Sequence, residues 1–246
     1  MKILKLLTRI LSIIQYCNIF NLHKFSFNID EYVNWVEVGA VTPVKNQGNF
    51  GTCWAFPITG AIEGLNFIKS NKLISLSEEA LVNNDYPDLG IYGGNYHKAI
   101  KLIVNNGGYL PSEKEWPYNI NNPIKKNYKK IINYNNPIPS MKITGIKKIN
   151  NNNYALKQAI KKQPVCIYIN GYSKLFTSYK LGIYNLTIYN NVDHGVLLVG
   201  YDTAKDYWLI KNSWGEKWGE NGYMRVSMKN NPYFEAFVPI ANNKPL

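Results

Sequence analysis

The chain changes its hydrophobic periodicity between its first and second halves, and this change limits the folds open to it. Apolar residues recur at steps of three and four from Trp54 to Ile68, which predicts an amphipathic helix. Two shorter helices are expected, one after the N-cap Ser77 and one from Tyr96 to Val104. The first half of the chain is therefore predicted to be helical.

The second half has short runs of β-branched and aromatic residues between turn formers, and these runs predict strands. They cover residues 141–149, 165–169, 196–201, 206–211 and 222–228, and one helix at about 153–162 interrupts them. We therefore expect an α+β fold with a helical lobe at about residues 28–121 and a β lobe at about 122–246.

Residues 1–27 differ from the rest of the chain. Lys2, Lys5 and Arg9 alternate there with isoleucine and leucine, as in a secretory leader or an amphipathic helix on a membrane surface. These charges interrupt the apolar stretch too often for a transmembrane helix. Of the two interpretations we favour the leader, which leaves residues 28–246 as the folded domain.

The chain is basic, with 28 Lys and Arg against 16 Asp and Glu and a net charge of +12. This charge permits a nucleic-acid or anionic-membrane partner. No zinc-finger, RNP-like or helix-turn-helix pattern accompanies it, and the densest basic run, residues 125–130, lies between Asn and Pro as in a surface loop. We expect lysines scattered over a solvated surface and no nucleic-acid partner.

Only three cysteines are present, too few for a disulfide framework or a Cys₄ metal site. Together with only three histidines, this count predicts no metal, and no other cofactor is expected. Cys53 lies at the predicted start of the long helix, where free backbone N–H groups lower the pKa of a thiol. Its alternative role is that of a small buried residue, which is how we interpret Cys166 in its apolar strand.

A cysteine nucleophile needs a base and a group that orients the base. His23 lies in the leader and His97 on the surface of a predicted helix, whereas His194 lies at the edge of a predicted strand and faces a cleft. Asn212 ends the next strand, which can pair with the first as a hairpin, although the alternative is an ordinary turn residue. Cys53, His194 and Asn212 together are typical of thiol-based acyl transfer.

These motifs resemble the papain-like cysteine proteases, the family of papain and the cathepsins. The similarity runs through residues 29–35, 39–48, 53–56, 93–94, 192–195, 207–214 and 218–223, in the family's order. His194 follows Cys53 by 141 residues, within the family's interval of about 130–150. The resemblance implies a two-lobed fold with the active site in the cleft between the lobes.

The resemblance also implies catalytic roles. Cys53 would be the thiolate nucleophile of a cysteine endopeptidase that forms an acyl-enzyme, and His194 its ion-pair partner and general acid. Asn212 would hold the imidazole, with Trp214 shielding that hydrogen bond from water. Gln47 and the backbone N–H of Cys53 would donate to the oxyanion. The alternative is a catalytically inert binding protein on the same scaffold.

The same resemblance implies a substrate cleft. Gly93 and Gly94 would bond an extended peptide backbone, and an apolar side chain two residues before the scissile bond would enter the main specificity pocket. The residues that match the lining of this pocket are Asn95, Tyr96, Tyr168 and Gly195, with its floor near Phe234 to Phe237. Because Tyr168 stands where smaller aliphatic residues are common, a shallower pocket is expected.

Several positions depart from the family pattern. Phe50, Asn83-Asn84 and Ile91 stand where cysteines are usual, so the usual disulfides are absent. Pro57 replaces a small polar residue and is expected to fall in the first turn of its helix, where proline is tolerated. No segment matches the family's inhibitory propeptide.

Partners and compartment follow from the resemblance alone. Protein or peptide substrates, proteinaceous inhibitors of cysteine proteases and a monomeric state are expected. A lysosome- or vacuole-like compartment or secretion is typical of the family, whereas missing disulfides fit a reducing intracellular compartment better. The sequon at Asn185 is interpreted as a chance match in an asparagine-rich chain.

Overall fold

The structure is a computed structural model that describes residues 31–84, 90–119, 121, 141–171, 173–185, 192–229 and 235–243. The leader of residues 1–27, the basic run at 125–130 and the sequon positions after Asn185 lie outside these ranges. Within them, no helix has both the length and the apolar character needed to cross a membrane.

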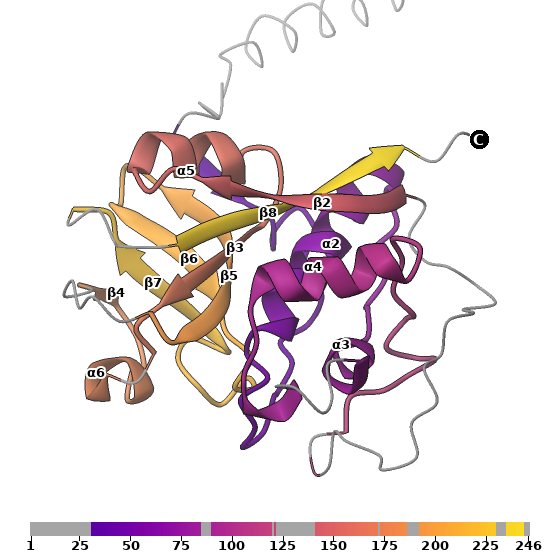
Figure 1. Cartoon of the computed structure of the whole chain (residues 1–246). Helices are drawn as coiled ribbons and strands as arrows, with labels where there is room; N and C mark the ends of the chain where they lie inside the picture. Colours follow the sequence, from indigo (N-terminus) through magenta and orange to yellow (C-terminus); the bar gives the residue numbers. More distant parts are fainter. Residues whose placement is uncertain are drawn as a thin grey trace, which may run out of the picture.

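The first part of the chain is helical, as expected (Figure 1). It holds α2 (Ala55–Ser70), α3 (Glu78–Asn84), the 3₁₀ turn η1 (Gly90–Tyr92) and α4 (Tyr96–Asn105). Helix α2 is buried on all sides as far as Asn66, because it contacts α3 and α4 as well as the sheet strands behind it. Pro57 lies in its first turn, where no intrahelical N–H is needed.

The rest of the chain forms most of an eight-stranded sheet. Its strands are β1 (Tyr32–Asn34), β2 (Met141–Ile149), β3 (Val165–Ile169), β4 (Ile183–Tyr184), β5 (His194–Asp202), β6 (Tyr207–Lys211), β7 (Tyr223–Ser227) and β8 (Glu235–Asn243). The order is β2-β8-β3-β5-β6-β7-β4, with β1 added beside β5, and all pairs except β4–β7 are antiparallel. Two helices, α5 (Asn153–Ile160) and α6 (Lys174–Thr177), lie between strands.

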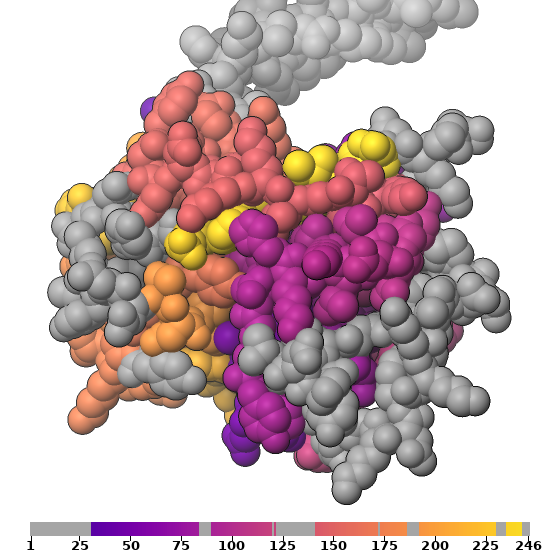
Figure 2. Space-filling model, viewed as in Figure 1, coloured from indigo at the N-terminus to yellow at the C-terminus, as the bar shows by residue number. Residues whose placement is uncertain are grey.

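The predicted α+β architecture is confirmed, but elements of each part of the chain pack against the other part. Strand β1, from the beginning of the chain, pairs with β5, and β2 packs along α4. Figure 2 shows α4 in contact with the segments of β2 and β8 on one face of the molecule. The division at about residue 121 therefore stays a prediction, since contacts cross it in both directions.

Two hydrophobic clusters hold this arrangement together. The first includes Ile58 and Ile62 of α2 and also takes in Met141, Cys166 and Phe237 from the strands. The second lies among the strands, α5 and α6, around large buried side chains such as Trp208 and Phe176. Strand β5 lies between the two clusters, because Leu197 and Val199 belong to the first cluster and Val196 and Leu198 to the second.

Candidate active site

Cys53 lies in the turn that leads into α2. The N–H of Ala55, the first residue of the helix, donates to the carbonyl of Thr52 over 2.9 Å and closes this turn, so Cys53 lies two residues before the helix begins. The Cys53 thiol is free and half-buried. Burial raises its pKa, so the lowering expected at a helix start is wrong for this structure, although a backbone hydrogen bond from Gly195 acts in the lowering direction. Gly195 lies so close that a Cβ on it would be 2.7 Å from the Cys53 carbonyl oxygen.

The imidazole and the candidate orienting amide meet at adjacent strand ends. His194 is the first residue of β5, Asn212 directly follows β6, and the two strands are antiparallel neighbours. Nε2 of His194 lies 2.8 Å from Oδ1 of Asn212 in a buried hydrogen bond. Because Oδ1 accepts, Nε2 carries the proton, and in the neutral ring Nδ1 is left as the acceptor.

Aromatic rings and backbone enclose His194, which is 5% exposed. Trp214 lies 4.8 Å and Phe176 5.7 Å from it between ring centroids, and a Cβ on Gly171 would overlap its side chain. This burial lowers the pKa of His194 to about 4, although the Asn212 hydrogen bond and the charge of Asp193 act the other way. An imidazolium here therefore needs a nearby negative charge.

Gln47 joins the loop before Cys53 to the segment after β6. Its backbone N–H donates to the carbonyl of Ser213, and its Oε1 accepts from Oγ of Ser213 over 2.7 Å. Its Nε2 donates to the carbonyl of Phe50 over 2.8 Å. A side-chain amide has two N–H donors, so fixing one on Phe50 still leaves a second for a ligand.

The glycine pair lies beside the start of α2. Trp54 donates from its indole N–H to the carbonyl of Gly90 over 3.1 Å, and a Cβ on Gly94 would overlap the Trp54 ring. At Gly93, whose φ is 144°, a Cβ would meet no atom within 4 Å. Gly93 therefore borders open space, as an edge that binds an extended peptide would.

Tyr96, Tyr168 and Gly195 are brought together as a wall. The two tyrosine rings stack with centroids 4.0 Å apart and an interplanar angle of 14°. The hydroxyl of Tyr168 accepts from the N–H of Tyr96, and the hydroxyl of Tyr96 donates to the carbonyl of Ile167. A Cβ on Gly195 would be 2.7 Å from that hydroxyl. Tyr168 is therefore held in place.

The remaining predicted lining residues contribute differently. Phe237 packs its ring edge-on against Tyr96 at 5.7 Å, whereas Phe234 lies outside the described residues. Asn95 is the N-cap of α4 and accepts from the N–H of Lys98, so its side chain also has a structural role. A polar hollow of about 530 Å³ lies beside Trp214, lined also by Asn46, Gly48, Asn49 and Asn121.

A buried charge cluster behind the site was not predicted. Nζ of Lys45 contacts the carboxylates of Glu63 and Glu78 at 3.3 and 2.8 Å, and Lys211, directly before Asn212, donates to the carbonyl of Thr42. Burial lowers the pKa of Lys211 to about 8. The sequence does carry a signal for these residues, since Glu63 interrupts the apolar face of a helix and Lys211 ends an apolar strand.

The described residues were also compared with the requirements of a metal site. Among the described residues, no three His, Cys, Asp or Glu side chains come together as a metal ion would require.

Comparisons with known proteins agree with this arrangement. Residues 29–242 match the sequence model of a family described as papain family cysteine protease. The probable cysteine protease RD21C of Arabidopsis thaliana is 39% identical over 215 residues, covering 83% of this chain and 45% of that protein. Mexicain of Jacaratia mexicana is 41% identical over 197 residues, covering 80% and 87%.

A solved structure is also similar. The crystal structure of the Carica candamarcensis cysteine protease CMS1MS2 in complex with E-64 superimposes with a TM-score of 0.76 at 33% identity, covering 87% of this chain and 99% of that one. The chain spans about half the length of the first curated relatives it matches.

Proposed function

This chain belongs to the papain family of cysteine proteases, and we propose that it hydrolyses internal peptide bonds through Cys53. The observation that carries the proposal is the buried 2.8 Å bond between His194 and Asn212, beside the turn that holds Cys53. This bond directs Nδ1 of the ring away from Asn212 and leaves it available to a thiol.

The proposed reaction begins with transfer of the Cys53 proton to Nδ1 of His194. Burial disfavours a lone thiolate and a lone imidazolium, but a transfer that forms both charges together lets each stabilise the other. The thiolate attacks the peptide carbonyl, and the imidazolium gives its proton to the leaving amine. Water, deprotonated by His194, then hydrolyses the thioester and releases the acid and the free thiol.

Two donors are proposed for the oxyanion of the tetrahedral intermediate. One is the backbone N–H of Cys53, and the other is the second amide N–H of Gln47. The contacts of Gln47 with Ser213 and Phe50 support this role, because they fix the amide before substrate arrives.

The substrate is proposed to lie extended along Gly93 and Gly94, with its second residue before the scissile bond against Tyr96, Tyr168 and Gly195. The stacked tyrosines support a shallow apolar pocket at this point. Trp214 and the polar hollow beside it would border the residues after the scissile bond.

We also propose the protein's partners, domain bounds and location. Protein inhibitors of cysteine proteases are expected to bind the same cleft of a monomeric enzyme. Residues 1–27 are proposed as a leader and 28–246 as the peptidase domain. A lysosome- or vacuole-like or secreted location is proposed, with a reducing intracellular compartment as the alternative.

The test uses the full chain and a thiol-directed peptidyl epoxide. We expect one adduct, on Cys53, and hydrolysis of a fluorogenic peptide with an apolar second residue. Cys53→Ala should lose both the adduct and the hydrolysis, whereas the matched variant Cys166→Ala should keep both because its thiol is buried against Pro57. A folded wild-type chain with neither labelling nor hydrolysis would favour the inert binding protein instead.

A further inference from the structure

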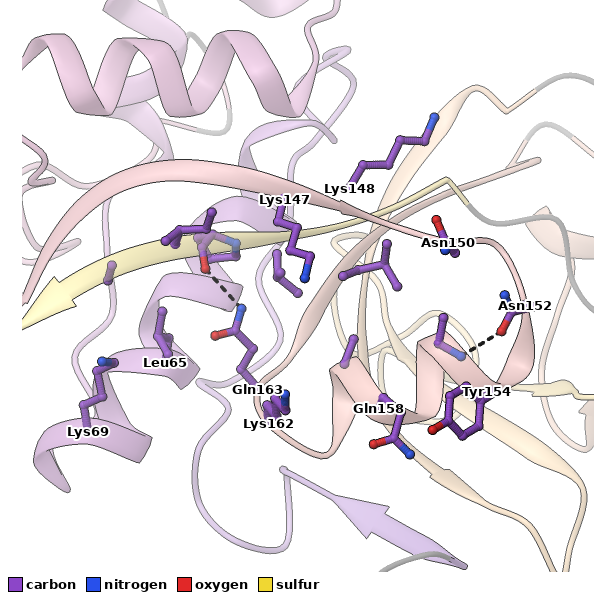
Figure 3. A pocket seen from close by; sticks show the side chains of 17 residues that line it. Leu65, Lys69, Lys147, Lys148, Asn150, Asn152, Tyr154, Gln158, Lys162 and Gln163 are labelled. Atoms are coloured by element: carbon purple, nitrogen blue, oxygen red, sulfur yellow. Dashed lines mark hydrogen bonds between the residues drawn. The ribbon is translucent and has the colours of Figure 1, made fainter.

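A groove lies at the far end of α2 from Cys53. It is framed by the end of α2, by β2 and β8, and by α5, and it encloses about 620 Å³ (Figure 3). This volume is in the range of about 300–1,000 Å³ typical of ligand sites. Leu65, one of its lining residues, lies ten residues after Ala55, about 15 Å along the helix axis. The groove is therefore separate from the proposed catalytic cleft.

The floor of this groove is apolar. Leu65, Ala159 and Val238 form part of it, and the large side chains of Ile240 and Tyr154 at its margin are 43% and 75% exposed. Single exposed apolar residues are ordinary on a protein surface, but several gathered on one hollow mark a surface suited to a partner.

The rim is positively charged. Four lysines line the groove, and none of its 17 lining residues is Asp or Glu. Lys148 forms an ion pair with Glu235 at 2.9 Å and points away from the hollow in Figure 3, whereas Lys147 points over it. Within the described ranges, the side-chain ammonium groups of Lys147 and Lys162 have neither a hydrogen bond nor an ion pair. Two cationic groups from different elements are thus available to a ligand.

Beyond Phe237, where its pairing with β3 ends, β8 has one unpaired side, and Pro239 hinders an added strand there. Pro239 has no N–H, and its carbonyl already accepts from Nε2 of Gln163 over 3.2 Å. A partner must therefore be recognised by its side chains. The exposure of Tyr154 and Ile240 also leaves the groove open to solvent beside them, which suits a polypeptide better than an alkyl chain that needs full enclosure.

We propose that this groove is a docking site for an acidic polypeptide segment, in which Asp or Glu residues flank an apolar side chain. The apolar side chain lies on the floor between Leu65 and Val238, and the carboxylates face Lys147 and Lys162. This proposal concerns binding alone and does not depend on the proposed catalysis.

The test measures fluorescence anisotropy of a short labelled peptide, a Leu-Phe pair flanked on each side by glutamates. The full chain carries Cys53→Ala so that the probe cannot be cleaved. We expect saturable binding that weakens with salt and with replacement of Leu-Phe by Ser-Ser. Lys147→Glu/Lys162→Glu should weaken it roughly tenfold or more, since each exposed ion pair contributes a factor of up to about five.

The matched control is Lys101→Glu/Lys114→Glu, which makes the same change in net charge at exposed lysines outside the groove. It should bind the probe like the parent. The milder variant Lys147→Gln/Lys162→Gln covers the case in which the reversed charges impair folding. Its loss of peptide affinity should lie between those of the parent and of the charge-reversal variant. Equal weakening in groove and control variants, or no binding by the parent, would overturn the proposal. So would groove-dependent binding of phosphatidylserine vesicles or single-stranded RNA without binding of the peptide.

Discussion

At the scale of single residues, the tyrosine pair is proposed to set the depth of the specificity pocket. The Tyr168 ring stacks on Tyr96, and its hydroxyl accepts from the Tyr96 N–H, so the ring cannot turn away without losing both contacts. These contacts hold the wall in one orientation, and we expect that orientation to limit which side chains the proposed pocket accepts.

Tyr168→Ala should deepen this pocket. We expect kcat/KM for a peptide with Phe at the second position before the scissile bond to rise roughly tenfold relative to the matching Ala peptide, because a pocket discriminates by about 1–3 kcal/mol per added group. Paired kinetics with both peptides measure this ratio. The exposed Tyr154→Ala serves as a control that should leave the ratio unchanged. An unaltered ratio in Tyr168→Ala would exclude this residue from the pocket.

His194 gives a prediction about pH. In Cys53→Ala, where no thiolate can pair with it, the imidazole should titrate near the pKa of about 4 that its burial produces. The unfolded chain takes up this proton near pH 6.5 and the folded chain only near 4. The free energy of unfolding should therefore fall by up to about 3 kcal/mol as pH drops through this window.

Histidine NMR titration and urea unfolding between pH 7 and 4 check this expectation. Replacing His194 with Gln in the same background should remove that part of the pH dependence. A titration at or above pH 6.5 would show that His194 is solvated or paired with another negative group.

Some site contacts follow from sequence and others do not. The residues alone indicated His194 and Asn212, and the resemblance implied Gln47. The structure bonds His194 to Asn212 and Gln47 to the neighbouring Ser213, although their catalytic roles stay predictions. The contact of Gly171 with His194 and the bond from Ser213 to Gln47 could not be predicted. They join residues distant in sequence, and no local pattern encodes such packing.

At the scale of helices and strands, the sequence predicted element bounds correctly only where the local pattern was strong. Strands at 141–149 and 165–169 match the predicted bounds, because β-branched runs and flanking turns mark them. Strand β8 was missed, since Pro239 and two terminal asparagines weaken its pattern and its pairing with β2 and β3 is non-local. Strand β1 and helix α6 were also missed, because three and four residues are too few to show a hydrophobic periodicity.

The buried charge cluster joins a loop and two helices. Their sequence patterns do not indicate that these three segments pack together. Lys45 lies in the loop before Cys53, Glu63 in α2 and Glu78 at the start of α3, and the two carboxylates are almost fully buried. Nζ of Lys45 also donates to the carbonyl of Leu76 over 2.9 Å. This single ammonium group therefore holds three segments together behind the site.

Lys45→Met should destabilise the protein by about 3–5 kcal/mol, because it leaves two buried carboxylates without their cation. Urea unfolding at neutral pH measures the change, and Lys101→Met on an exposed position of α4 is the control, with an expected change below about 0.5 kcal/mol. The deficit should shrink at acid pH, where the carboxylates can protonate. A loss equal to that of Lys101→Met would mean that the cluster does not support the fold.

At the scale of the whole molecule, packing and backbone bonds connect the parts that disulfides join in the family. Phe50 and Ile91 stand at two positions where the resemblance implies cysteines, and the N–H of Gly51 donates to the carbonyl of Ile91 over 2.7 Å between the same segments. Cys53 and Cys166, the two cysteines in the described ranges, are both free. Between the two lobes, the described residues likewise share strands and core side chains and form no disulfide.

That sharing predicts a single cooperative unfolding transition. Because β1 pairs with β5 and the α2 core includes side chains from β3, β5 and β8, neither lobe can unfold without exposing apolar surface of the other. Hydrogen exchange followed peptide by peptide across a urea series should give one midpoint for α2 and α4 and for β6 and β7. Ile62→Ala in the first core and Val226→Ala in the second should each cost about 2–4 kcal/mol and lower the midpoint of both sets of peptides equally. If Val226→Ala shifted β6 and β7 while α2 and α4 kept the wild-type midpoint, the lobes would be independent folding units and the shared strands would not couple them.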